Sequence, residues 1–153
     1  MRKIIVALVA VATTALAVSQ PLSASAPDQA QGTEVTTSAT TTESRWVDGN
    51  LIEERVATRV LSGTFAGKLD SRFTRITFKD GDRFSQGFET CDPCTVDGRT
   101  GTVVFRFEAH TTDRNGTVAL LTIVDATGEL EGLHGFLRVV NGVYTGSYHF
   151  ESP

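Results

Sequence analysis

The sequence predicts an all-β fold, a small closed antiparallel β-barrel of about seven or eight strands. Short segments that alternate apolar and polar residues follow one another through the last two-thirds of the chain, separated by Asp-Gly and Asn-Gly dipeptides that favour turns. No window of ten or more residues has a convincing helical period. Closure is expected because a chain this small protects its sheet edges best by joining them. A β-sandwich is the main structural alternative.

The chain begins with the features of a secretory signal peptide, which we place at residues 1–26. A basic pair is followed by the apolar residues 4–18, and Ala24 and Ala26 supply the small residues of a cleavage site. The apolar run is shorter than the roughly 20 residues of a membrane-spanning helix. The sequence therefore predicts a secreted protein, extracellular or periplasmic, with no membrane association after cleavage.

Residues 27–45 predict a disordered linker. This segment is rich in Thr and Ser, and Val35 is its one β-branched apolar residue, so it buries too little apolar surface to offset chain entropy. The folded barrel domain is predicted to span residues 46–153, beginning at Trp46. Its length, about 108 residues, suffices for one small domain.

The first strands of that domain are predicted from alternation and turns. Residues 50–61 alternate Val with Thr and Arg, which favours a strand over a helix. Residues 75–88 contain Asp80-Gly81 between two β-type runs, which indicates a hairpin. Residues 101–110 alternate most clearly, with one apolar face formed by Val103, Phe105, Phe107 and Ala109.

The last strands follow the same logic. Residues 117–124 are apolar on both faces and predict a central strand. Residues 136–150 form two strands around Asn141-Gly142, a pair favoured in type I′ turns because both central residues need a positive φ.

Charge and motif content exclude several classes of function. The net charge of −4 does not suit a nucleic-acid backbone, so no nucleic-acid partner is predicted. The fingerprints of serine hydrolases, zinc proteases, phosphate-binding loops and dinucleotide sites are absent from the sequence, and no cofactor is predicted. The sequence does not predict an oligomeric state.

Both cysteines lie in a C-D-P-C segment, Cys91 to Cys94. A redox-active pair normally opens a helix, whereas this segment lies between β-type runs. A structural zinc needs four ligands, and no second pair has a suitable spacing, so no metal site is predicted. Asp92-Pro93 favours a turn, and exported proteins retain disulfides. We predict a structural disulfide in a turn at a barrel end, with a redox-active pair, a metal site or free thiols as alternatives.

Two groups of side chains are candidates for a functional site. Arg106, Glu108 and His110 share one face of a predicted strand. If that face points inward, Glu108 or His110 could act as an acid–base group and Arg106 could orient an anionic ligand. The alternative is a solvated outer face. Tyr144 and Tyr148 share a face of the last strand, where they either line a cavity for an apolar ligand or belong to the core.

Four glycine-rich segments occur in a fixed order: SGTFAGKL (62–69), TVDGRTGTVVFRFEAH (95–110), VDATGELEGLHGF (124–136) and YTGSYHF (144–150). Together they resemble an uncharacterised family of small bacterial β-barrel proteins, close in character to allene oxide cyclase-like and calycin-like barrels. The resemblance implies a closed barrel with an internal cavity and with Leu130 and Leu133 plugging one end. It carries over no catalytic residues, because its motifs are turns.

Three function hypotheses remain open. The first is an exported barrel that binds a small apolar or amphipathic molecule. The second is a cyclase or isomerase that confines a reactive substrate, which requires an inward polar pair. The third is a structural or interaction protein whose barrel is filled by side chains.

Overall fold

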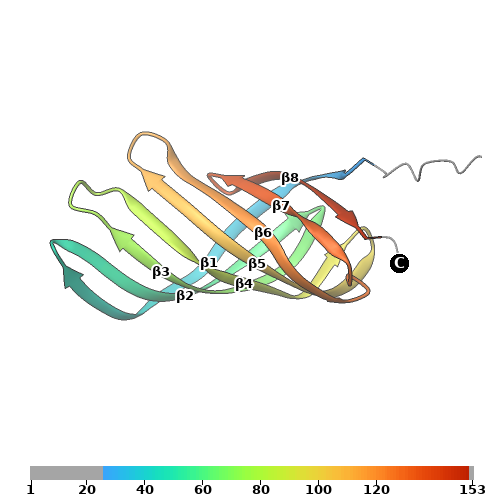
Figure 1. Cartoon of the computed structure of the whole chain (residues 1–153), viewed down its shortest axis with the longest axis horizontal. Coiled ribbons are helices and arrows are strands. Elements are labelled where there is room, and N and C mark those ends of the chain that lie inside the picture. The colour runs from blue at the N-terminus through green and yellow to red at the C-terminus, as the bar shows by residue number, and fades with distance from the viewer. Residues whose placement is uncertain (1–25, 152–153) are drawn as a thin grey trace, which may run out of the picture.

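The computed structural model describes residues 26–151 and consists of strands and turns throughout. Eight antiparallel strands follow the chain and are hydrogen-bonded in sequence order into a closed ring, because β1 also pairs with β8 (Figure 1). The strands are β1 (Asp28–Val47), β2 (Asn50–Gly63), β3 (Phe65–Thr77), β4 (Arg83–Val96), β5 (Arg99–Thr112), β6 (Gly116–Gly128), β7 (Leu133–Val140) and β8 (Val143–Phe150). The predicted all-β, antiparallel architecture and strand number are confirmed.

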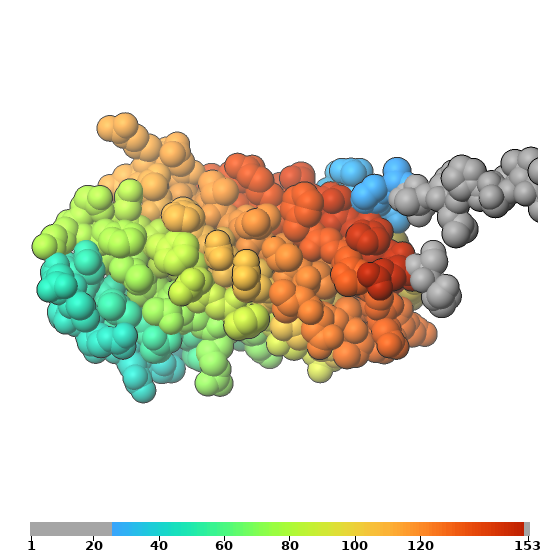
Figure 2. All heavy atoms as spheres, viewed as in Figure 1, coloured from blue at the N-terminus to red at the C-terminus, as the bar shows by residue number. Residues whose placement is uncertain are grey.

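The ring is uneven because its strands differ in length. β7 and β8 have 8 residues each, whereas β1 has 20 and β2 to β6 have 13 or 14. The ladder to β8 involves only residues 28–33 of β1, and the rest of β1 pairs with β2 alone. The hairpins β1–β2, β3–β4 and β5–β6 therefore project beyond β7–β8 at what we call the open end (Figures 1 and 2). No helix within residues 26–151 has the length and apolar character to cross a membrane.

The predicted disordered linker at residues 27–45 is wrong, because residues 28–47 form β1. The prediction considered only apolar burial, whereas this strand is held by backbone hydrogen bonds to β2 and β8, and its Thr residues suit an exposed sheet. The folded part accordingly begins at Asp28 rather than at Trp46, whose side chain is 72% exposed. The predicted signal peptide lies, except for Ala26, outside the described residues.

Two bulges interrupt the outer part of β1. Thr37 and Thr42 are extra residues relative to β2, and their hydroxyls donate hydrogen bonds to the carbonyls of Thr58 and Glu54 (3.1 Å each). Bulges and charged residues discourage pairing of an edge strand with another chain. The free edge of β1, which also carries Glu43 and Arg45, is protected in this way.

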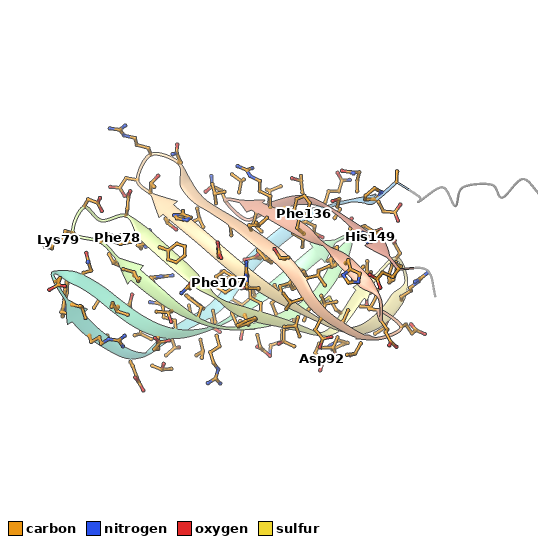
Figure 3. All side chains as sticks on the ribbon, in the orientation of Figure 1. Phe78, Lys79, Asp92, Phe107, Phe136 and His149 are labelled. Carbon is orange, nitrogen blue, oxygen red and sulfur yellow. A yellow bond between two sulfur atoms is a disulfide. The ribbon has the colours of Figure 1, made fainter. Side chains whose placement is uncertain are left out.

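The hairpin turns agree with the sequence prediction. Asn141 and Gly142, between β7 and β8, have φ values of 49° and 82°, the positive values that a type I′ turn requires. Asp80-Gly81 lies in the turn between β3 and β4, next to the labelled Phe78 and Lys79 (Figure 3). These turns fix the register of the strands that they join.

Apolar side chains fill the other end of the ring, which we call the filled end. Phe65 packs edge-on against Phe105 and Tyr148, with ring centroids 6.0 and 5.6 Å apart. Leu130 lies in the connection between β6 and β7, and Leu133 is the first residue of β7. Both are buried against this cluster, as the resemblance implied. The predicted inward face of β5, from Val103 to Ala109, is likewise buried.

The C-D-P-C segment forms a bulge within β4 instead of the predicted turn between strands. Cys91 pairs with Val103 and Cys94 with Gly101, so β4 contains one extra residue here. Residues three apart in a regular strand face opposite sides, and the extra residue turns both side chains inward. The two sulfurs are bonded and fully buried, with their Cα atoms 5.1 Å apart. Gly67 faces them, where a Cβ would lie 2.7 Å from the sulfur of Cys91.

Because β1 closes the ring, its removal should prevent folding. A chain that begins at Trp46 should show no cooperative thermal transition by circular dichroism, whereas a chain that begins at Pro27 should unfold cooperatively. Cooperative unfolding of the shorter chain would show that β1 is dispensable.

Burial of both sulfurs predicts that Cys91 and Cys94 are inert in the native protein. Intact mass should be lower than that of the dithiol by two hydrogens, and iodoacetamide should label neither residue unless the protein is first unfolded and reduced. Reduction should lower the free energy of unfolding by only about 1–2 kcal/mol, because the closed loop is short. Rapid labelling of the native protein would contradict the structural role.

Candidate functional site

The first predicted candidates lie on the outer face of β5. Arg106, Glu108 and His110 are all exposed, and Arg106 Nη2 lies 3.7 Å from Glu108 Oε1. The ring of His110 packs against Phe84, also outside, with centroids 4.9 Å apart. The structure brings these three residues together on one face but directs them away from the interior.

The two tyrosines are inside, but in the filled end. The hydroxyl of Tyr144 accepts a hydrogen bond from the Phe65 amide (2.9 Å) and donates one to the Phe65 carbonyl (3.1 Å). The hydroxyl of Tyr148 donates to the carboxylate of Asp97. Burial raises the pKa of both tyrosines, and Asp97 adds to the effect at Tyr148. These side chains therefore act as core residues with satisfied hydroxyls, and neither lines the cavity described next.

A cavity of about 290 Å³ occupies the open half of the ring. One wall is apolar and aromatic, and Phe107 projects into the interior from β5 (Figure 3). The facing wall is charged and comes from β1, β2 and β3. The lining residues are Glu34, Thr36, Arg59, Phe73, Arg75, Ser85, Phe107, Ala109, Thr111, Thr117, Ala119, Val139, Asn141 and Gly142.

Arg59 is the centre of the charged wall. Its guanidinium lies between two carboxylates, with Nε 3.4 Å from Glu34 Oε1 and Nη1 paired with Glu89 Oε1. The side chain of Glu89 is fully buried and also accepts a hydrogen bond from the Ser71 hydroxyl at 3.0 Å. The guanidinium faces the ring of Phe107, 5.3 Å from its centroid. A buried carboxylate requires such a partner, because an unpaired charge in an apolar interior is costly.

Four buried side-chain polar atoms have no hydrogen-bond partner within residues 26–151, and two of them line the cavity. The four atoms are Glu34 Oε2, Arg75 Nε, Glu89 Oε2 and Arg55 Nε. Buried polar groups are ordinarily satisfied, so unsatisfied ones beside a cavity indicate where a ligand or water can bind. Glu34 and Arg75 line the cavity directly and offer it one acceptor and one donor.

Burial also perturbs ionisation in this wall. It raises the pKa of Glu34 above 4.5, and the nearby Arg59 opposes the shift only in part. Burial lowers the pKa of Arg59 and of Arg75, although guanidinium groups remain charged over the ordinary pH range. Glu34 is thus a carboxyl group that can hold a proton at a higher pH than an exposed glutamate.

The charged wall was missed by the sequence analysis, although one signal for it was present. Arg59 follows Ala57 and precedes Leu61 at the strand period of two, so a charged residue stands among inward apolar positions. Glu34 gave no signal because it lies in the segment predicted to be disordered.

A histidine pair lies elsewhere, on the outside of β7 and β8. The rings of His134 and His149 stack with centroids 5.6 Å apart, and His134 Nε2 lies 3.1 Å from Glu151 Oε1. Between residues 26 and 151, no group of three or more His, Cys, Asp or Glu side chains is arranged to hold a metal ion.

The two carboxylates that contact Arg59 should respond oppositely to neutralisation. The pKa of Glu34 is raised in the folded state. Protonation of Glu34 therefore favours the folded protein, fully below about pH 4.5, and this stabilisation is lost as the pH rises through the folded-state pKa. Glu34→Gln should therefore be at least as stable as the wild type near neutral pH, with the difference vanishing in acid. Glu89→Gln should lower the free energy of unfolding by about 3 kcal/mol, because Glu89 is fully buried and makes the closer of the two contacts with Arg59, so its neutralisation removes the main counter-charge of a buried guanidinium.

Urea unfolding across a pH series measures both variants. Destabilisation of similar size in both variants at neutral pH would contradict the assignment of burial as the dominant influence on Glu34.

Comparisons with known proteins agree with this fold. The chain matches the profile of the family described as "Protein of unknown function (DUF3224)" over residues 30–151, a range that includes almost all of β1. No curated protein matches it. It is similar to the crystal structure, at 1.84 Å resolution, of a protein of unknown function from the DUF3224 family of Shewanella oneidensis MR-1. The TM-score is 0.68, with 19% identity over 84% of this chain and 100% of that one. Likeness at this identity concerns the fold alone.

Proposed function

The chain belongs to the DUF3224 family of proteins of unknown function, and we propose that it binds a small amphipathic molecule in the cavity at the open end. One observation carries the proposal: the cavity combines an apolar wall with a charged wall on which buried polar atoms lack partners. An apolar body against Phe107 and Val139, with a polar group toward Glu34 and Arg75, would use both walls.

The distribution of side chains supports binding over a purely structural role. The filled end already supplies a core of aromatic and aliphatic residues. A ring with only a structural role would not need charged groups in its other half, because burying them costs free energy. The binding site proposed from Tyr144 and Tyr148 is accordingly moved to the open half.

The predicted export and the likeness to allene oxide cyclase-like barrels remain part of this proposal. In that form, the protein is a secreted binding protein that holds its ligand in the open half of the ring. The disulfide between Cys91 and Cys94 suits an oxidising compartment.

A second candidate is an isomerase or cyclase that acts on a reactive molecule held in the cavity. The observation that favours it is Glu34, a cavity carboxyl with a raised pKa that could transfer a proton. This role was assigned in the sequence analysis to Glu108 or His110, which are exposed.

Filling the cavity should abolish binding without changing the outer surface. The probe is N-phenyl-1-naphthylamine, an uncharged fluorophore that brightens in apolar sites. Ala119→Phe places a ring in the cavity and should reduce the fluorescence increase at least fivefold. Leu120→Phe, on the outward face of the same strand, is the matched control and should behave like the wild type.

Native mass spectrometry of the protein purified from its producing culture supplies an independent test. We expect a bound small molecule in the wild type and in Leu120→Phe, and none in Ala119→Phe. Equal fluorescence in all three proteins, together with an unliganded wild type, would refute a cavity ligand.

A further inference from the structure

We infer that the cavity selects a small organic anion and binds its charged head through Arg75, an inference that rests on the proposed function. The ligand class is a carboxylate or another planar or tetrahedral oxyanion attached to a short apolar body. Arg75 is suited to the role because guanidinium groups bind such anions through two parallel hydrogen bonds.

The ion pairs of the interior leave Arg75 unmatched. Arg55 Nη1 lies 3.0 Å from Glu53 Oε1, and Arg59 contacts both Glu34 and Glu89. Arg75 makes no ion pair with any residue between 26 and 151, and its buried Nε has no hydrogen-bond partner. A ligand anion would supply the missing counter-charge.

The surroundings of Arg75 favour an anion over a cation. The pKa of Arg75 is lowered first by burial and then by Arg55. Glu53 opposes this shift, and Arg83 and Arg59 add smaller effects that lower the pKa further. Several guanidinium groups therefore surround this position, although the whole chain is acidic. A cationic ligand head at this position would meet like charges, while an anionic head would supply a counter-charge to Arg75.

The position of Arg75 sets the orientation of the ligand. β3 runs from the filled end toward the open end, and Arg75 stands two residues before its last residue, Thr77. Phe73 precedes it on the same inward face, with the Arg75 guanidinium 5.8 Å from the ring centroid. The anionic head would thus lie near the mouth, and the apolar body would extend inward past Phe73 toward Phe107.

Three probes that share a phenylpropyl skeleton and differ in the charge of the head group are 3-phenylpropanoate, 3-phenylpropan-1-ol and 3-phenylpropylamine. Isothermal titration calorimetry measures the dissociation constant of each with the full-length protein. We expect the wild type to bind the carboxylate at least tenfold more tightly than the alcohol, since hydrogen bonds to charged groups are the stronger ones. The amine should bind most weakly.

Arg75→Met keeps an unbranched, flexible stem and removes the guanidinium with its charge, and should weaken binding of the carboxylate at least tenfold while leaving the alcohol within twofold. Arg72→Met is the matched control, because Arg72 lies on the same strand with its side chain on the exposed outer face. It should bind all three probes like the wild type. If Arg75→Met does not fold, Arg75→Lys takes its place and should weaken carboxylate binding at least threefold.

The outcomes distinguish this inference from the proposed function. Carboxylate and alcohol binding of equal strength, tighter binding of the amine, or an unchanged carboxylate affinity in the Arg75 variant would overturn anion selection while retaining a cavity ligand. Failure of all three probes and of the naphthylamine fluorophore to bind the wild type would refute both.

Discussion

The ladder between β1 and β8 is the constraint on which the rest of the structure depends. Six residue pairs, from Asp28–Tyr148 to Thr33–Val143, convert an eight-stranded sheet into a ring. Gly32 stands at this seam, where any Cβ would overlap the hydroxyl of Tyr144. That hydroxyl is itself bonded to the backbone of Phe65, so the seam links β1 and β8 to the start of β3. Closure and core packing at the filled end are thus parts of one arrangement.

The closed ring also explains how charges are tolerated inside it. The filled end provides most of the apolar burial, from Phe65, Phe105 and the leucines around them. The open half can then hold Arg59 and its carboxylates, whose burial is costly but compensated by close pairing. The apolar core and the charged wall are therefore separated along the axis of the ring, and changes at one end need not compromise the other.

The sequence predicted the architecture well where alternation and turn residues agree. The inward face of β5 and the Asn141-Gly142 turn are local features, and each follows from strand periodicity or from a positive φ. β1 escaped prediction because its stability comes from ladders with distant strands rather than from its own apolar residues. The charged wall escaped for a related reason: Glu34, Arg59 and Glu89 come from three strands, and only closure brings them together. The bulge at Cys91 and Cys94 depends on register, which spacing alone does not reveal.

The placement of the two described termini has a practical consequence. β1 begins and β8 finishes at the filled end, so Asp28 and Glu151 both lie opposite the mouth of the cavity (Figure 1). A support, a fluorescent fusion partner or a surface linker joined at either terminus would point the cavity toward solution. Attachment at either end would thus leave the mouth of the cavity unobstructed.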